Sequence, residues 1–341
     1  MLQSIMTEPG KIEFRQIEKP KIGADEILLE VRRIGICGSD IHVYHGAHPY
    51  TSYPVVQGHE VSGYVAAVGE KVTGVSVGDM ATFTPQVTCG HCYPCRHGMY
   101  NICETLKVMG FQTDGAGQEY FPLPDWNVLK LPDGFSLDYG ALIEPIAVGV
   151  HALQRGGGVQ GKRVLILGAG TIGNLTAQSA RAMGAESVMI TDINEYKLEK
   201  ARACGIDLVV NSAKEDLGEA IATHFGPDKA DLILECVGAQ ASAGQAVEHA
   251  RKGTTIVIVG VFGEKPTVDL GLVQDRELSL VGTLMYRKPD FAQAIELVST
   301  GKMHLDEVIT HRFPFERYLD AYHAIEAAHG NSMKVMVELG G

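Results

Sequence analysis

The middle of the chain alternates between apolar runs and segments with helical periodicity. The run RVLILGAG, residues 163–170, reads as a buried strand that ends in glycines, and TIGNLTAQSARAMG repeats its apolar residues at helical spacing. The alternation continues through SVMITD, EYKLEKARACG, LVVN, EDLGEAIATHFG, DLILECVG, QASAGQAVEHARKG, TTIVIVGV and LSLVGTL. Because strands joined by crossover helices pair in parallel, this pattern predicts an α/β fold with a doubly wound parallel sheet.

The residues before this region have a different character. Short β segments such as EILLEVRRIG, EVSGYVAAVG and DMATFTP are broken by glycine and proline up to about Glu144, which favours antiparallel strands. We predict a β-rich domain over residues 1–150 and a parallel-sheet domain over 151–284. Residues 285–341 would return to the first domain, with a helix at about 289–300 and then a strand, a helix and a strand.

Composition excludes several classes of partner. The formal net charge of −12 argues against binding to nucleic acid or to an anionic membrane surface. No apolar run approaches the ~18 residues that span a bilayer, and the start MLQSIMTEPGKIEF lacks the features of a secretory signal. Unpaired cysteines in a chain without a signal indicate a reducing compartment, so we expect a cytoplasmic protein.

Four of the seven cysteines fall in the run CGHCYPCRHGMYNIC. The spacing C-x2-C-x2-C-x7-C places four thiolates in one loop, which is typical of a closed tetrahedral zinc site. An iron–sulfur cluster and a disulfide-rich loop are the alternatives, but no Cys-Pro follows the run and nothing else indicates secretion. The predicted structural-zinc ligands are Cys89, Cys92, Cys95 and Cys103.

The segment Gly168–Gly173 has the pattern G-x-G-x-x-G. It follows a predicted strand and opens a predicted helix, and Asp192 closes the next strand. The glycines would let backbone amides approach a pyrophosphate at the helix N-terminus, and Asp192 would accept hydrogen bonds from ribose hydroxyls. A carboxylate there disfavours a 2′-phosphate, so we predict NAD rather than NADP, although Lys197 could temper this preference. The alternative is a tight turn that binds nothing.

Three separate segments offer ligands for a second, reactive metal. They are GICGSDIH with Cys37, GHE with His59 and Glu60, and IEP with Glu144. Each has an ordinary explanation as a buried thiol, a surface turn or a helix start. Together they could supply a thiolate, an imidazole and a carboxylate and leave one coordination position open, as in catalytic zinc sites.

With these motifs in place, the chain resembles the zinc-dependent medium-chain dehydrogenase/reductase superfamily over nearly its whole length. Within it, the chain is similar to the polyol (sorbitol-type) and threonine dehydrogenase branch. The resemblance rests on GICGSDIH, PVVQGHEVSGYV, the cysteine cluster, GAGTIG with its aspartate, and LSLVGTL. It implies a GroES-like catalytic domain beside a Rossmann domain, oxidation of a small-molecule alcohol with NAD, and a homodimer or homotetramer.

The resemblance also assigns roles to residues. Cys37 and His59 match ligands of the catalytic zinc, and Glu60 and Glu144 match two carboxylates that take turns near it, so two zinc ions per subunit are expected. Ser39 would take the alcohol proton and pass it through the nicotinamide ribose to His42 at the solvent. The implied cofactor contacts are Gly168, Gly170, Ile172, Gly173, Asp192, Lys197, Val259, Val261, Thr283 and Leu284.

One departure concerns the substrate. Sorbitol dehydrogenases have an arginine on the late strand where Met285 aligns, although Tyr286 still matches a neighbouring tyrosine. The loop 45–53 and Phe111 are expected to line the pocket. The leading hypothesis is oxidation of a secondary alcohol of a polyol, sugar or sugar acid. The alternatives are L-threonine 3-dehydrogenase, another alcohol dehydrogenase, and a non-catalytic NAD-binding protein, which the complete set of site residues disfavours.

Overall fold

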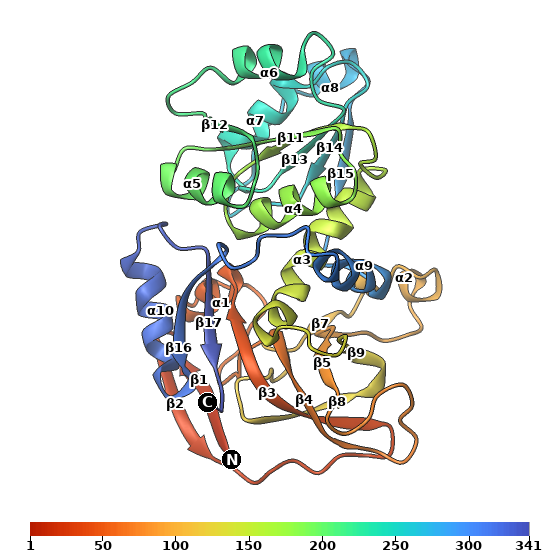
Figure 1. Cartoon of the computed structure of the whole chain (residues 1–341), viewed down its shortest axis with the longest axis vertical. Helices are drawn as coiled ribbons and strands as arrows, with labels where there is room; N and C mark the ends of the chain where they lie inside the picture. The colour runs from red at the N-terminus through yellow and green to blue at the C-terminus, as the bar shows by residue number, and fades with distance from the viewer. Residues whose placement is uncertain (341) are drawn as a thin grey trace. The chain divides into compact units, whose positions relative to one another are not determined.

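The computed structural model describes residues 1–340 and divides the chain into two compact units. Unit 1 comprises residues 1–144 together with the C-terminal segment from Ile309, and unit 2 comprises Pro145–Val308. Unit 1 is therefore built from both ends of the chain, which Figure 1 shows as red and orange elements beside dark blue ones.

Unit 1 is organised around a seven-stranded sheet of order β16-β17-β3-β4-β5-β9, with β8 also paired to β3. Its long central strand β3 pairs antiparallel with β4 on one side, and on the other side with β8 along residues 26–30 and with β17 along residues 33–36. The C-terminal strand is thus integral to the sheet. The sheet strands are β3 (Glu26–Ile36), β4 (Glu60–Val68), β5 (Met80–Phe83), β8 (Tyr120–Pro124), β9 (Val128–Lys130), β16 (Ile309–Pro314) and β17 (Lys334–Glu338).

Smaller elements complete unit 1. Two hairpin-like pairs, β1 with β2 and β6 with β7, lie outside the large sheet. These strands are β1 (Leu2–Glu8), β2 (Lys11–Gln16), β6 (Gln86–Val87) and β7 (Lys107–Val108). The helical elements are α1 (Gly38–Tyr44), α2 (Tyr93–Arg96), α10 (Tyr318–Ala327) and the 3₁₀ turns η1 (Tyr100–Ile102), η2 (Asp125–Asn127) and η3 (Phe315–Arg317).

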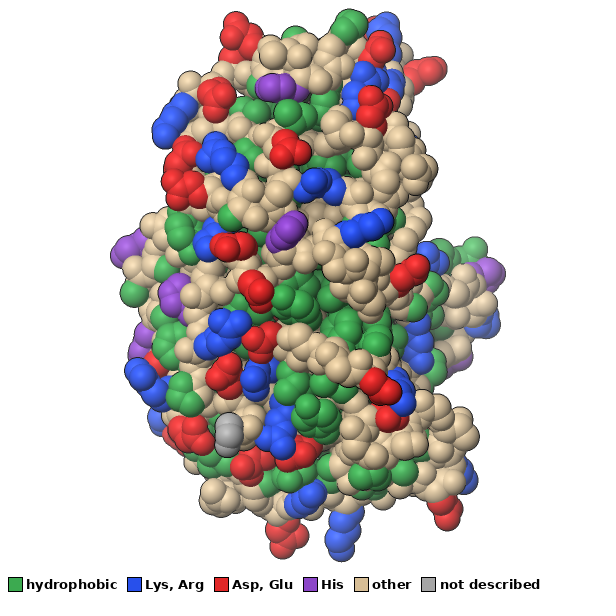
Figure 2. All heavy atoms as spheres, in the orientation of Figure 1, with side chains coloured by type: hydrophobic (Ala, Val, Ile, Leu, Met, Phe, Trp, Pro, Cys, Tyr) green, Lys and Arg blue, Asp and Glu red, His purple; other side chains and the backbone are tan. Residues whose placement is uncertain are grey.

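Alternation of apolar side chains in β3 and β4 builds the core of unit 1. Ile27, Leu29 and Val31 point to one face of β3 and are almost completely buried with Val61 and Val65 of β4. Aromatic side chains of α10 close the same core. Figure 2 shows that the visible face mixes apolar side chains with acidic and basic ones.

Unit 2 contains a six-stranded parallel sheet of order β12-β11-β10-β13-β14-β15. The order reverses between β10 and β13, which is the arrangement of a Rossmann fold. The strands are β10 (Arg163–Leu167), β11 (Ser187–Asp192), β12 (Leu208–Asn211), β13 (Leu232–Glu235), β14 (Thr255–Ile258) and β15 (Ser279–Gly282). The helices are α4 (Thr171–Ala182), α5 (Glu195–Ala203), α6 (Leu217–Phe225), α7 (Gln240–His249), α8 (Leu270–Asp275) and α9 (Lys288–Ser299).

The boundaries of the units differ from the sequence-based ones at 150/151 and 284/285. The helix α3 (Leu137–Arg155) carries the chain from one unit to the other, so the division falls inside a helix, at Glu144/Pro145. Residues 285–308, including α9, belong to unit 2, where Phe291 and Leu297 are buried. The return to unit 1 therefore begins only at Ile309.

The sequence pattern did not reveal α3. Pro145 lies in its interior, and proline there removes one backbone hydrogen bond at a cost of about 3 kcal/mol. Burial outweighs this cost, since Ala141, Leu142, Ile143 and Ile146 have no exposed surface. Within residues 1–340, no helix combines the length and apolar character that a membrane span requires.

Candidate functional site

Cys37, His59 and Glu60 form one cluster in unit 1, with candidate ligand atoms all within 4.8 Å of one another. Cys37 follows the end of β3 and caps α1, and Glu60 is the first residue of β4. The antiparallel register places Glu60 opposite Gly35, two residues before Cys37, so sheet pairing itself brings the segments together. A side chain at position 35 would collide with the carboxylate of Glu60, which explains the glycine.

The donor set of this cluster fits a zinc ion. A thiol, an imidazole and a carboxylate are the common ligands of catalytic zinc. Burial alone lowers the pKa of His59, but the charges of Asp40 and Cys37 outweigh it and raise the pKa to about 10. The negative groups around His59 therefore strongly favour a positive charge on its imidazole ring. A metal ion bound to the ring would supply that charge in place of the proton.

Lys334 is a member of this site that the sequence analysis missed. Its ammonium lies 2.6 and 2.5 Å from the two carboxylate oxygens of Glu60, and it donates a hydrogen bond of 3.0 Å to the carbonyl of Ile36. Both charged side chains are almost fully buried. The sequence could have indicated this residue, because a lysine inside the apolar run MKVMV is expected to be buried and therefore to need a buried charged partner.

Lys334 also changes the charge balance of the site. One thiolate and two carboxylates, from Cys37, Glu60 and Glu144, exceed the charge of Zn2+ by one. The ammonium of Lys334 supplies one positive charge, which offsets the excess from these three ligands. Because burying an unpaired charge is costly, the pairing of Lys334 with Glu60 lowers the cost of burying both groups.

Glu144 lies outside the three-residue cluster but close to it. It is buried on α3, and its charge raises the pKa of both His59 and Lys334. The structure thus places all four predicted metal-site residues in one region, with Glu60 inside the closest group and Glu144 beside it.

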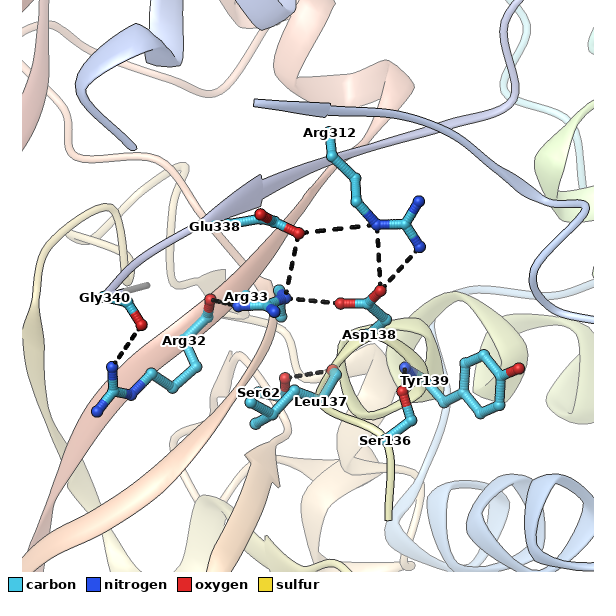
Figure 3. Close-up of polar contacts among 10 residues, drawn as sticks. All are labelled: Arg32, Arg33, Ser62, Ser136, Leu137, Asp138, Tyr139, Arg312, Glu338 and Gly340. Carbon is cyan, nitrogen blue, oxygen red and sulfur yellow. Dashed lines mark hydrogen bonds and ion pairs between the residues drawn. The ribbon is translucent and has the colours of Figure 1, made fainter. Parts of the chain in front are cut away.

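A polar cluster anchors the start of the helix that carries Glu144. Figure 3 shows Arg33 of β3 and Arg312 of β16 converging on Asp138, at 2.6 and 2.8 Å, with Glu338 of β17 beside both arginines. Although partial burial opposes it, hydrogen bonds from Arg312 and Arg33 lower the pKa of Asp138. Asp138 lies six residues before Glu144, about 9 Å along a helix, so the cluster fixes the helix near its functional carboxylate.

The four clustered cysteines form a second group whose sulfur atoms all lie within 4.8 Å. The Sγ–Sγ distances are 3.8 Å for Cys92 and Cys103 and 4.0 Å for Cys89 and Cys95. With Zn–S bonds of about 2.3 Å, a tetrahedron has edges of about 3.8 Å, which fits these values. Backbone N–H groups of His91 and Cys92 lower the pKa of Cys89 to about 6, which favours the thiolate that zinc needs.

The predicted relay residues both lie on α1. Ser39 is half-buried and His42 is exposed, and their spacing of three residues puts them on one face of the helix. The ring centroids of Phe111 and His59 are 4.9 Å apart, and the ring of His48 stacks on Phe111 at the same centroid distance. Of the predicted pocket residues, Phe111 thus lies against His59, and His48 lies against Phe111.

The predicted cofactor residues gather at one edge of the sheet in unit 2. The four residues of the glycine fingerprint lie between β10 and α4 or in the first turn of α4, and Asp192 ends β11. The residues that follow β14 and β15 are Val259, Val261, Thr283 and Leu284. Because the strands are parallel, all these positions lie at their carboxyl ends. Lys197 differs, since it lies on α5, the helix after Asp192. Apart from Lys197, these residues come from separate segments of the chain, and the parallel sheet brings them to one edge.

The glycine fingerprint has the geometry of an anion cradle. Gly168 has a φ of +103°, and a side chain at Gly173 would collide with the carbonyl of Gly168. A side chain at Gly170 would meet nothing within 4 Å, so this position faces open space at the start of α4. Gly170 also provides no side chain to cap that helix, which leaves its first amides for a phosphate.

Asp192 is oriented by the backbone around it. Its two carboxylate oxygens accept hydrogen bonds from the amides of Ala169 and Asn194, at 2.8 and 2.9 Å. Large apolar side chains are unusually exposed at the same edge, including Ile193 at 72% and Val261 at 86%. Ile193 and Val237, which follow β11 and β13, were not predicted. In the sequence, each of these apolar residues stands one or two positions after the end of a strand. An adenine or nicotinamide ring bound at that edge needs such an apolar wall.

Residues 285 and 286 do not share one environment. Met285 adopts a φ of +50°, which is uncommon for a residue with a side chain. Tyr286 has no exposed surface and packs edge-on against Phe291, with ring centroids 4.7 Å apart. The tyrosine that aligned beside the arginine of sorbitol dehydrogenases is therefore fully buried against Phe291.

Comparisons with known proteins agree with this architecture. The family profile described as "Alcohol dehydrogenase GroES-like domain" matches residues 23–133, and the one described as "Zinc-binding dehydrogenase" matches residues 171–300. The chain is 35% identical to a D-xylulose reductase of Saccharomyces cerevisiae, over 98% of this chain and 96% of that protein. It is 32% identical to an L-threonine 3-dehydrogenase of Pyrococcus horikoshii, over 99% of both chains.

A solved structure is equally similar. The alcohol dehydrogenase RspB of Escherichia coli CFT073, crystallised with NADH, superposes with a TM-score of 0.91 at 32% identity, over 99% of both chains. A GroES-like unit with two metal-ligand clusters and a Rossmann unit with a dinucleotide cradle define a zinc-dependent alcohol oxidoreductase. The chain belongs to the zinc-dependent medium-chain dehydrogenase/reductase superfamily, and zinc and NAD are its cofactors.

Proposed function

We propose that this enzyme oxidises a secondary alcohol of a polyol, sugar or sugar acid to the ketone, with NAD as acceptor. The observation that carries the proposal is the buried cluster of Cys37, His59 and Glu60, with Glu144 and Lys334 beside it. One all-cysteine cluster and one mixed cluster support two zinc ions per subunit. A homodimer or homotetramer and a cytoplasmic location stay predictions.

Different residues of the chain would bind the zinc ion and transfer the proton. Cys37, His59 and the exchanging carboxylates would hold zinc, which polarises the alcohol oxygen, while bound NAD accepts the hydride. Ser39 would accept the hydroxyl proton, and His42, exposed on the same face of α1, would release it to water. The alcohol thus loses a hydride and a proton and becomes a ketone.

His42→Gln should lower turnover near neutral pH by about 10–100-fold, at the low end of general acid–base effects. The reason is that glutamine keeps hydrogen bonding but cannot carry the proton to solvent. The measurement is kcat against pH, with the zinc content of the same samples. His323→Gln, a change at another histidine of unit 1, is the control. Loss of zinc from the His42 variant would make that residue a ligand and contradict the relay.

NAD should exceed NADP by more than tenfold in kcat/KM, because a 2′-phosphate would approach the carboxylate of Asp192. Each tenfold corresponds to about 1.4 kcal/mol. Asp192→Ser should narrow this preference, chiefly by weakening NAD. Steady-state kinetics with both cofactors provide the measurement, and Glu195→Ser, three residues away, is the control for a general loss of negative charge. Equal use of both cofactors by the wild type would remove Asp192 from the ribose site.

A substrate panel tests the proposed substrate class. Without a guanidinium at Met285, the site lacks one pair of donors for vicinal hydroxyls. We therefore expect sorbitol to be a poor substrate relative to the best polyol, sugar or aldonate, as measured by NADH absorbance. L-Threonine belongs in the panel as the second candidate. Best activity on threonine would replace the proposal, and best activity on sorbitol would contradict the role of position 285.

A further inference from the structure

A chain of buried polar contacts links the C-terminal helix α10 to the metal cluster. Tyr322 of α10 donates its hydroxyl hydrogen to Oε1 of Gln57 at 2.8 Å. The side-chain amide of Gln57 donates in turn to Oδ1 of Asp40 at 3.1 Å. That same oxygen lies 3.6 Å from Nδ1 of His59. Two hydrogen bonds thus lead from residue 322 to Asp40, and a longer contact of 3.6 Å joins Asp40 to Nδ1 of His59, a buried atom that makes no hydrogen bond within residues 1–340.

Every member of this chain is inaccessible to water. Tyr322, Gln57, Asp40 and His59 are each at most 4% exposed. A lost partner here would leave a polar group unpaired in a low-dielectric environment, where water cannot replace the bond. The other oxygen of Asp40 accepts a hydrogen bond of 2.9 Å from the amide of Cys37. Asp40 therefore touches the segments of two ligands, and its orientation affects both.

The orientation of the Gln57 amide is the critical point. Its oxygen and its NH2 group have opposite hydrogen-bonding roles, and only one orientation lets it donate to the carboxylate of Asp40. The hydroxyl of Tyr322 selects that orientation by donating to the oxygen. Without this hydroxyl the amide could turn and present its oxygen to Asp40, where two acceptors repel each other.

We propose that Tyr322 and Gln57 are positioning residues of the catalytic zinc site, and that they act through Asp40 on the ring of His59. Fixing Nδ1 toward Asp40 leaves the other ring nitrogen as the metal ligand and holds the imidazole in one orientation. The inference rests on the proposed metal centre and goes beyond it, because it assigns a role to two residues outside the ligand set.

Tyr322→Phe removes the hydroxyl and keeps the ring, so it tests the chain with little change in packing. Outer partners of metal-binding histidines typically contribute 10–100-fold in metal affinity, and we expect about tenfold weaker zinc binding at the mixed site. The measurement is a competition titration with a chelator, on protein that retains zinc at its four-cysteine site by elemental analysis. Cobalt(II) absorption at the emptied mixed site reports ligand geometry independently of activity.

Tyr44→Phe is the matched control. The ring of Tyr44 packs against Tyr322 with centroids 5.2 Å apart, but its hydroxyl contacts His323 at 3.2 Å rather than Gln57. Gln57→Met, which keeps the length of the side chain, should weaken zinc to a similar extent as Tyr322→Phe. The double variant should lose little more, because both changes break one chain.

The possible results distinguish the positioning role of Tyr322 from the existence of the metal centre itself. Weaker zinc binding and an altered cobalt spectrum in Tyr322→Phe, with wild-type values in Tyr44→Phe, support the positioning role. Unchanged affinity in Tyr322→Phe, or equal losses in both tyrosine variants, overturns it while the metal centre stands. Wild-type protein that binds no metal outside the four-cysteine site overturns the proposed metal centre and this inference together.

Discussion

Replacing Lys334 by methionine should lower the melting temperature of unit 1 by about 10 °C in protein without metal at the mixed site. Lys334 is the close partner of Glu60, and both are almost completely buried. Removing one partner of a buried ion pair typically costs about 3–5 kcal/mol, because the other charge remains unpaired. In a unit of this size each kcal/mol shifts the midpoint by about 2–4 °C. Differential scanning calorimetry provides the measurement.

Two further variants make the Lys334 prediction specific. Lys11→Met breaks an exposed pair with Glu13 and should shift the midpoint little, because surface pairs contribute about 0–1 kcal/mol. The double variant Lys334→Met and Glu60→Gln should recover part of the loss, since it removes both charges of the pair. Equal effects of Lys334→Met and Lys11→Met would show that the buried pair contributes no more than a surface one.

Cys95→Ser should unfold or loosen the four-cysteine loop, with a large loss of thermal stability and of the associated zinc. The apparent binding free energy of structural zinc in small domains is about 10–16 kcal/mol, and much of it is folding free energy. In the wild type, a strong chelator should lower the melting temperature. In Cys95→Ser the same chelator should have almost no further effect at this site. Elemental analysis and thermal unfolding with and without chelator test this.

Cys204→Ser is the control for the loss of a buried thiol. Cys204 is fully buried and lies outside both metal clusters, with its sulfur 3.4 Å from the carbonyl of His304. Its variant should keep both zinc ions and the chelator response of the wild type. A Cys95→Ser variant that keeps the wild-type melting temperature but loses activity would contradict the structural role of the cluster.

The parallel sheet was predictable because each strand carries its own signal. The apolar runs predicted at 187–192 and 208–211 correspond to β11 and β12 residue for residue. The glycines that end RVLILGAG marked the turn before α4, and the structure begins that helix at Thr171. Local periodicity and turn chemistry determine such elements, so one sequence suffices to find them.

The helix α3 and the true unit boundaries were not predictable in this way. Pro145, Gly140 and Gly149 all disfavour a helix locally, and tertiary burial overrides that preference. Likewise, the local sequence does not show that residues 285–308 belong to unit 2. Their place depends on where side chains such as Phe291 are buried, which only the folded structure shows.

The candidate site was also predictable only in part, because some of its residues stand in local motifs and others do not. Its predicted ligands stand in recognisable motifs, so the sequence alone could propose Cys37, His59 and Glu60, and the structure places them together. Their supporting partners come from distant segments: Lys334 is 274 residues from Glu60, and Tyr322 is 265 residues from Gln57. Such pairs are set by strand register and helix packing, and no spacing rule in one sequence reveals them.

The use of both chain ends in unit 1 has a consequence for biosynthesis. Strand β17 pairs with the central strand β3 and carries Lys334, so the sheet that supports the mixed cluster lacks a central neighbour until the ribosome has made residues 334–338. Unit 2 is one uninterrupted segment and is complete at Val308. A released chain that ended shortly after that residue would therefore contain its whole nucleotide-binding unit, but it could not complete the site that holds the reactive metal.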